Sequence, residues 1–248
     1  MAEVKLAGSL IGKTGIANVV KPLQENTHVR HVDLASNGLN EFGATKIAEV
    51  LKLSNGLRSL SLEDNSIKNP GAEELAAAIE VNSNLHTLHL SCNRIDDSGC
   101  QGFGSAEELA AAIEVNSNLH TLHLSCNRID DSGCQRLAVA LRSNTSIHTF
   151  FLDRNNAGDD FAREMGVTLQ RSGNNTSTHT FFLDRNNAGH DFAREMGITL
   201  QMNRTLHTLD LSDNDIKFPG AAALSKAVSG NSTMTALNLT RNSIGNEA

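Results

Sequence analysis

The sequence of 248 residues contains no tryptophan and no tyrosine, and phenylalanine, with nine residues, is its only aromatic side chain apart from histidine. Trp, Tyr and Arg supply most of the binding energy at protein interfaces, so a tight interface here would depend on Phe and Arg. No apolar run approaches the roughly 18 to 20 residues that a membrane span needs. The first ten residues contain one lysine and no continuous apolar run, so they lack the pattern of a signal peptide. We therefore expect a cytoplasmic protein that does not enter a membrane.

Positive charge is also scarce. Lys and Arg number 21 against 28 Asp and Glu, which gives a formal net charge of -7. Nucleic acid needs a basic face to neutralise its phosphates, so this balance argues against nucleic-acid binding and favours a neutral or basic protein partner. Cysteine is limited to four residues, which we expect to be free thiols in a reducing cytosol. They are Cys92, Cys100, Cys126 and Cys134.

Internal repetition is the strongest signal that the chain carries. Residues 72–101 recur unchanged at 106–135, and residues 148–170 recur at 179–201 with two differences. An eleven-residue motif underlies both duplications and begins eight times, at residues 29, 57, 85, 119, 147, 178, 206 and 234. Its fourth and sixth positions are apolar, the period of a strand with one buried face. Apolar residues four apart in the rest of each unit, such as Ile47 and Leu51, predict a helix.

The motif, as in LHTLHLSCNRI from Leu85, resembles the leucine-rich-repeat pattern LxxLxLxxNxL over residues 29–248. The period of about 28 residues with a helical second half is similar to the ribonuclease-inhibitor-like subclass. The resemblance implies an α/β solenoid with parallel strands on its concave face and helices on its convex face. Strands stack more closely than helices do, so such a stack curves into a horseshoe.

The expected organisation is a partial repeat or cap helix in residues 1–28, followed by eight repeats in residues 29–248. The last repeat is truncated and has no polar cap, which suggests a fragment of a longer protein and allows end-to-end association through that end. We expect the extra residues around 102–104 to form a bulge on the convex side. Helix starts are predicted at Asn69 with Pro70, and at a Ser105–Glu108 capping box.

Two sets of residues are predicted to be structural. Large Phe150 and Phe181 replace the usual Leu, and small Ala157 and Ala188 accompany them, which indicates compensation of volume in the core. The asparagine at the ninth motif position is expected to form a ladder that satisfies the turn after each strand. This ladder comprises Asn37, Asn65, Asn93, Asn127, Asn155, Asn186, Asn214 and Asn242.

Side chains alternate along a strand, so motif positions three, five and seven should face the concave side. Two consecutive Phe residues occur in the fifth and sixth repeats, and one ring of each pair must point outward. Exposed rings flanked by charge are typical of an interface centre. The predicted partner-binding residues are Phe151, Phe182, Asp153, Asp184, Arg154, Arg185, His89 and His123.

The sequence gives less support to a metal site, a disulfide, a phosphate-binding loop or a catalytic site than to a binding surface. His89 and His123 should lie on neighbouring strands, but zinc needs three or four converging ligands, so no metal site and no cofactor are predicted. Cys92 and Cys126 should lie close enough for a disulfide, which a reducing cytosol disfavours. Residues 7–14 fit a relaxed phosphate-binding-loop pattern without the domain that it requires. No catalytic constellation stands out, and we predict no enzyme activity.

The resemblance implies a protein-binding module, acting as a scaffold or in recognition, with a partner on the concave face. Two narrower roles are alternatives. One is a regulator of the GTPase-activating type for a small GTPase, and the other is an enzyme inhibitor similar to ribonuclease inhibitors.

Overall fold

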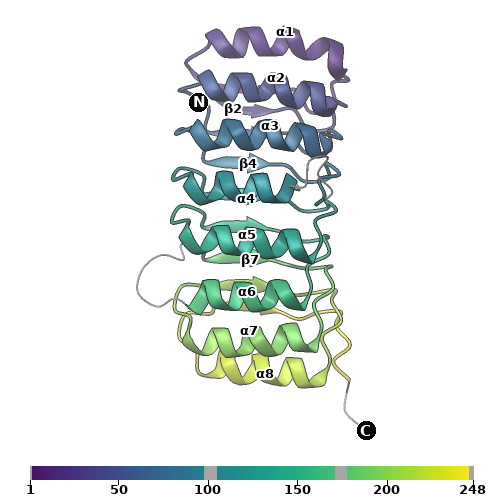
Figure 1. Cartoon of the computed structure of the whole chain (residues 1–248), viewed down its shortest axis with the longest axis vertical. Coiled ribbons are helices and arrows are strands. Elements are labelled where there is room, and N and C mark those ends of the chain that lie inside the picture. The colour runs from purple at the N-terminus through teal and green to yellow at the C-terminus, as the bar shows by residue number, and fades with distance from the viewer. Residues whose placement is uncertain (1, 98–104, 171–177, 246–248) are drawn as a thin grey trace.

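The computed structural model describes residues 2–97, 105–170 and 178–245, so the bulge expected around residues 102–104 lies outside the described residues. Within these ranges the chain alternates strand and helix from end to end (Figure 1). The strands are β1 (Ala2–Lys5), β2 (Val29–Asp33), β3 (Ser59–Ser61), β4 (Thr87–His89), β5 (Thr121–His123), β6 (Thr149–Phe151), β7 (Thr180–Phe182), β8 (Thr208–Asp210) and β9 (Ala236–Asn238). The helices are α1 (Gly12–Glu25), α2 (Asn40–Leu53), α3 (Lys68–Val81), α4 (Ser105–Val115), α5 (Asp131–Ser143), α6 (Asp159–Gln170), α7 (His190–Met202) and α8 (Phe218–Ser229).

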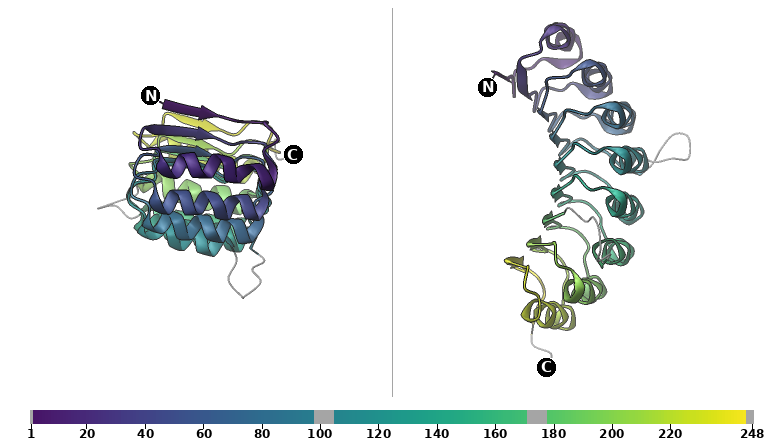
Figure 2. Two further views of the ribbon diagram at one scale, coloured as in Figure 1. Left: turned by 90° about the horizontal axis from the view of Figure 1, so that it is seen from above. Right: turned by 90° about the vertical axis from the view of Figure 1, so that its left-hand side faces the viewer.

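The strands form one parallel sheet in sequence order, β1 to β9. Equivalent motif positions pair with one another, so that His89 lies opposite His123, and Phe151 opposite Phe182. Figure 2 shows the strands along the inside of a curved stack and the helices along its outside. The predicted α/β solenoid, with a concave sheet and convex helices, is confirmed. Among the described helices, none is long and apolar enough to cross a bilayer.

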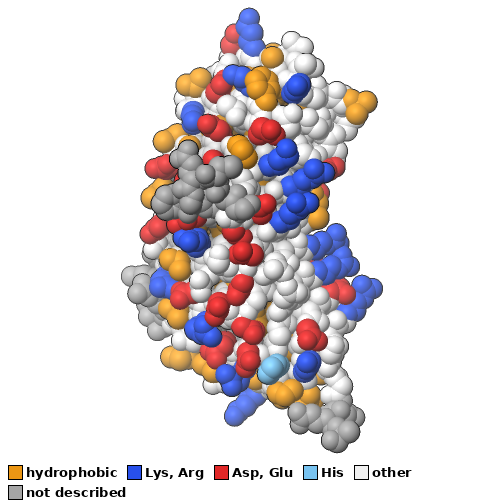
Figure 3. Space-filling view, turned by 45° about the vertical axis from the view of Figure 1, so that its right-hand side comes forward, with side chains coloured by type: hydrophobic (Ala, Val, Ile, Leu, Met, Phe, Trp, Pro, Cys, Tyr) orange, Lys and Arg blue, Asp and Glu red, His pale blue; other side chains and the backbone are white. Residues whose placement is uncertain are grey.

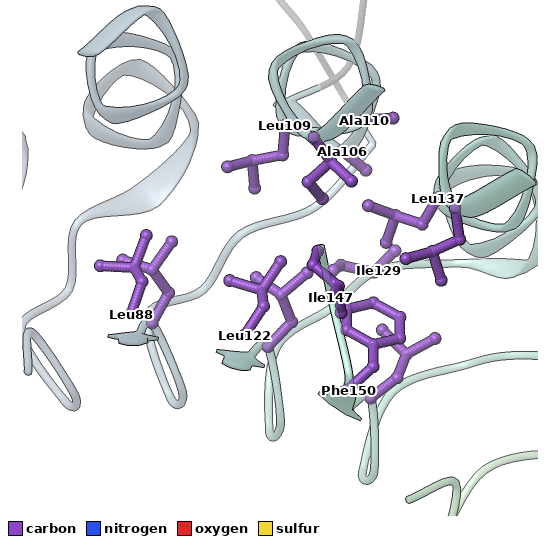
Figure 4. Packing of buried hydrophobic residues seen from close by; sticks show 14 of the residues in the cluster. Leu88, Ala106, Leu109, Ala110, Leu122, Ile129, Leu137, Ile147 and Phe150 are labelled. Carbon is purple, nitrogen blue, oxygen red and sulfur yellow. The ribbon is translucent and has the colours of Figure 1, made fainter. Parts of the chain in front are cut away.

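The core lies between the sheet and the helices. Leu88, Leu122 and Phe150 occupy the same motif position in successive repeats and point toward the helix layer, where Leu109 and Leu137 meet them (Figure 4). All five side chains are at most 1% exposed, so each repeat buries its apolar face against its neighbours. The large rings predicted to be compensated in volume lie in this core together with their small companions: Phe150, Phe181, Ala157 and Ala188.

The turn that follows each strand is held by the ninth-position asparagines. Asn93 is fully buried, and its amide donates to the carbonyls of Leu62 and Ser91. Its Oδ1 accepts the backbone N–H groups of Asn65 and Ile67 in the preceding repeat. Each of the eight members of the predicted ladder donates its amide to a carbonyl of the preceding unit, which links each turn to the adjacent repeat.

A second row of asparagines was missed by the sequence analysis. These residues lie three positions before a motif begins, where each helix has just ended. Asn116 donates to the carbonyls of Ile79 and Asn82, and its Oδ1 accepts the N–H groups of Asn118 and Leu119. Among the described residues the row comprises Asn26, whose Oδ1 accepts the N–H groups of His28 and Val29, and Asn82, Asn116, Asn144, Asn203 and Asn231, which also donate to carbonyls of the preceding unit. The recurrence of asparagine three residues before the motif is the sequence signal that could have revealed this row.

The N-terminal segment contains more than the expected helix, because β1 adds a strand to the edge of the sheet beside β2. The loop that follows, which fits the phosphate-loop pattern, uses its N–H groups within the fold. Gly8 donates to the carbonyl of Ala35, and Gly12 to that of Asn37. Phosphate binding by a loop needs such N–H groups free, so the geometry argues against that interpretation.

Helices begin close to both predicted starts, but both predicted caps are wrong. Helix α3 begins at Lys68, one residue before the expected cap, and the Asn69 amide instead bonds to Asp96 of the next repeat. Ser105 is the first residue of α4, and its buried hydroxyl has no partner among the described residues, so the expected capping box is not formed. The start of α6 is capped by a side chain of the preceding repeat. Asp131 accepts the N–H groups of Gly158 and Phe161 there.

Candidate binding surface on the concave face

A continuous row of stacked rings runs across the middle of the concave sheet, formed by fifth-position side chains. The centroids of His89 and His123 lie 3.9 Å apart, those of His123 and Phe151 3.8 Å, and those of Phe151 and Phe182 4.4 Å. Interplanar angles of 15°, 10° and 5° make the rings almost parallel. All four side chains are half-buried, because their faces cover one another and their edges reach the concave surface. We call these four residues the aromatic row.

The aromatic row lines a groove of about 470 Å³ on the concave face. Every predicted partner-binding residue lines it except Arg185, which lies at the rim and pairs with Asp213 at 3.5 Å. Glu63, Ser91, Ser125 and the thiols Cys92 and Cys126 complete the lining. A second groove of about 340 Å³ continues toward β1 and shares Glu63 and His89 with the first.

Carboxylates lie beside the rings at one end of the row. Asp153 accepts a hydrogen bond from the Ser125 hydroxyl. Burial raises the pKa of Asp184, and the negative charges of Asp153 and Asp210 raise it further, while Arg185 opposes the shift. These three carboxylates form no ion pair with Lys or Arg in the described part of the chain.

The two histidines of the aromatic row behave as neutral aromatic rings. Burial lowers the pKa of His89, and it lowers the pKa of His123 to about 4, with the charge of His89 as a second cause. Next to them, burial raises the pKa of the Cys92 thiol to about 12, helped by the adjacent Cys126 thiol. Cys92 and Cys126 are free, and Cys92 is therefore a poor nucleophile at neutral pH.

A family model described as Leucine Rich repeat matches residues 25–48, 54–76, 81–104, 115–138, 203–225 and 230–248, more than half of the chain. The chain belongs to the leucine-rich-repeat family. The matched segments leave out most of the Phe-containing repeats, whose spacing and core composition differ from the others. No curated protein matches this leucine-rich-repeat chain.

Solved structures are similar to the array at low sequence identity. Actin-binding site 2 of leiomodin-1 aligns with a TM-score of 0.42 and 23% identity, over 45% of this chain and 64% of its own. An internalin (inlF) from Listeria monocytogenes aligns with a TM-score of 0.48 and 18% identity, over 91% of this chain and 57% of its own. The leucine-rich-repeat chain thus spans less than two thirds of either structure.

A second column of imidazoles stacks along the strand-entry edge of the leucine-rich-repeat sheet. Its members are second-position residues with centroids 4.8 to 5.3 Å apart. The Nδ1 atoms of His86, His120 and His207 each bond to the backbone carbonyl two residues earlier. Since a carbonyl only accepts, Nδ1 donates and the proton is fixed there. The column comprises His86, His120, His148, His179 and His207.

The geometry of the leucine-rich-repeat array disfavours metal binding by the histidines of the groove. His89 and His123 meet face to face, so their ring faces, rather than their nitrogen lone pairs, point at each other. In residues 2–97, 105–170 and 178–245, no group of three His, Cys, Asp or Glu side chains is placed to hold one metal ion.

Proposed function

We propose that this leucine-rich-repeat array is a protein-binding module that holds its partner on the concave face. The observation that carries the proposal is the aromatic row. Four stacked rings are half-exposed in one groove. Partner atoms that cover the ring edges would remove this apolar surface from water, as the anchor residues of interfaces do.

The helix-bearing side differs in character. Figure 3 shows Lys and Arg side chains close to Asp and Glu side chains there, with apolar side chains scattered among them. Several of these charges pair across helices, such as Arg142 with Glu164 and Arg136 with Glu107. A mixed, self-paired surface is typical of a solvated face, whereas the concave face combines aligned rings with Asp153, Asp184 and Asp210, which form no ion pair with Lys or Arg in the described ranges.

Affinity capture tests the proposal, with the whole chain as bait in lysate of the cell that produces it. We expect Phe151→Ala/Phe182→Ala to lose the partners that the unchanged chain retains. The matched control is Val167→Ala/Ile198→Ala, which removes apolar atoms that are 42% and 47% exposed on the helices of the same two repeats. The same partners on both double variants would contradict the proposal.

Inhibition of an enzyme is a narrower form of this function. The 28-residue spacing with a helix in every complete described repeat supports the ribonuclease-inhibitor-like subclass, in which a bound enzyme would be blocked. A GTPase-activating role is the other candidate, and Arg154 favours it. This arginine lines the groove and makes no ion pair within the described residues, so its guanidinium is available to a partner. Turnover by a panel of small GTPases, with Arg154→Ala as comparison, tests that role.

A further inference from the structure

We infer that the partner segment on the concave face has an apolar centre with a cationic group on each side, in the order basic, apolar, basic. This inference rests on the proposed concave-face function and specifies the chemistry of what binds there. It follows from where the carboxylates of the concave surface stand relative to the aromatic row.

The first group of carboxylates lies in the two repeats before the aromatic row. Asp33 and Glu63 line the groove that runs toward β1, and Asp64 follows Glu63 at the strand-exit rim. None of the three forms an ion pair with Lys or Arg within the described ranges. Nearby Lys5 already pairs with Glu3 at 2.9 Å. We call Asp33, Glu63 and Asp64 the first acidic group.

The second group lies at the other end of the row, in the fifth to seventh repeats. It consists of Asp153, Asp184 and Asp210, and we call it the second acidic group. Asp153 and Asp184 line the same groove as Phe151 and Phe182. Of the nearby cations, Arg185 pairs with Asp213 at 3.5 Å and its charge also reaches Asp184, while Arg154 lines the groove with Asp153 and Asp184 and forms no ion pair in the described part of the chain. The mutual repulsion of the carboxylates favours the entry of a further cation.

The aromatic row lies between the first acidic group and Asp210, which is paired with Phe182 on the next strand, whereas Asp153 and Asp184 lie beside the Phe rings. The two grooves meet at Glu63 and His89. Glu63 belongs to the repeat of β3 and Asp210 to that of β8, five strand steps apart, or about 24 Å at the usual strand separation. An extended chain covers that span in about seven residues. Charge complementarity therefore selects a segment with cations about seven residues apart and apolar side chains between them, with the apolar part over the rings.

The experiment uses the full chain and a fluorescein-labelled synthetic peptide with a Lys–Arg pair on each side of a central Leu–Phe–Ser–Leu–Phe–Leu segment. Fluorescence anisotropy at low salt measures its dissociation constant. A second peptide has the same composition with all four cations at one end. The variants are Glu63→Gln/Asp64→Asn, Asp184→Asn/Asp210→Asn and Phe151→Ala/Phe182→Ala. The matched control, Glu80→Gln/Glu114→Gln, removes two exposed charges from helices on the convex side.

We expect each concave carboxylate pair to contribute roughly 5-fold to peptide affinity, and the convex control to change it by less than about 2-fold. We also expect the rearranged peptide to bind more weakly, and binding of the original peptide to weaken as salt rises. The inference is overturned if the peptide does not bind, if the convex control weakens it equally, or if both peptides bind alike. If Phe151→Ala/Phe182→Ala abolishes partner capture while the concave carboxylate variants do not affect it, the proposed function stands and this inference fails.

Discussion

The ring of His123 stacks on the ring of Phe151 with centroids 3.8 Å apart and planes 10° from parallel. His123 belongs to one duplicated pair of repeats and Phe151 to the other, so two separate duplications meet in one aromatic surface. Parallel register places equivalent positions side by side, which turns repetition of a residue type along the sequence into a row across the sheet.

Acid should destabilise the fold through His123. Unfolded imidazole has a pKa near 6.5, whereas burial holds the pKa of His123 at about 4. Above a pH of about 6.5 the His123 ring is neutral in both the folded and the unfolded chain, so the stability that its burial contributes is fully present. It is lost as pH falls from about 6.5 to about 4, because the unfolded chain binds the proton first. Since the ring is partly exposed, we expect a loss of about 1 to 2 kcal/mol after allowance for solvent screening.

Urea unfolding between pH 7.5 and 4.5 measures this effect, with His123→Phe as comparison. Phe occupies the same position in the next repeat, so the variant keeps a ring in the row while removing the titrating group. The variant should lose less stability in acid than the unchanged chain does. An identical pH dependence would show that His123 does not contribute.

Volume compensation in the core predicts a coupled pair. Phe150→Leu should destabilise the fold by about 1 to 3 kcal/mol, because it leaves a cavity at a fully buried site. Ala157→Ile alone should also destabilise, because it overpacks a buried position. The double variant recreates the Leu122 and Ile129 pair of the preceding repeat, so its cost should be smaller than the sum of the two. Simple additivity in urea unfolding would contradict the compensation.

The first asparagine ladder should be uneven in strength. Asn93→Ala leaves four buried backbone groups without their side-chain partner, which should cost about 2 to 4 kcal/mol. Asn155 is half-buried, and its Oδ1 accepts from Ile129 alone among the described N–H groups. Asn155→Ala should therefore cost clearly less. Equal midpoints in chemical unfolding of the two variants would refute this ranking.

The second asparagine row gives a sharper test, because it was not foreseen. Asn116→Asp replaces an amide that donates to two carbonyls with a carboxylate that repels them, so stability should fall by about 2 to 3 kcal/mol. Asn118→Asp adds the same charge two residues later at a more exposed site and should cost less than about 0.5 kcal/mol. Thermal unfolding of both variants decides whether the row is structural, and a similar shift for both would show that it is not.

Residues of the repeat motif made the fold predictable. Alternating Leu60 and Leu62, or Leu88 and Leu90, identified strands only three residues long, because the same spacing recurred eight times. The composition of the concave face followed from the same alternation. The structure brings His89, His123, Phe151 and Phe182 into one groove with Asp153, Asp184 and Arg154, while Arg185 pairs at the rim.

Bonds between repeats explain what the sequence analysis missed. The cap of α3 was wrongly predicted because Asn69 bonds to Asp96 of the next repeat, a partner 27 residues away that no local capping rule includes. Strand β1 was missed because AEVK lacks the motif, and among the described strands it pairs with β2 alone. The carbonyl partners of the imidazole column depend on ring rotation, which residue spacing does not determine.

The central claim is that the aromatic row on the concave face binds the partner. Its most direct test is the equilibrium dissociation constant of a captured and purified partner for three forms of the chain. We expect Phe151→Ala/Phe182→Ala to weaken binding by at least about 10-fold, since two interface anchors are removed, and Val167→Ala/Ile198→Ala to leave it within about 2-fold. Unchanged affinity in the Phe variant, or an equal loss in the convex control, would contradict the claim.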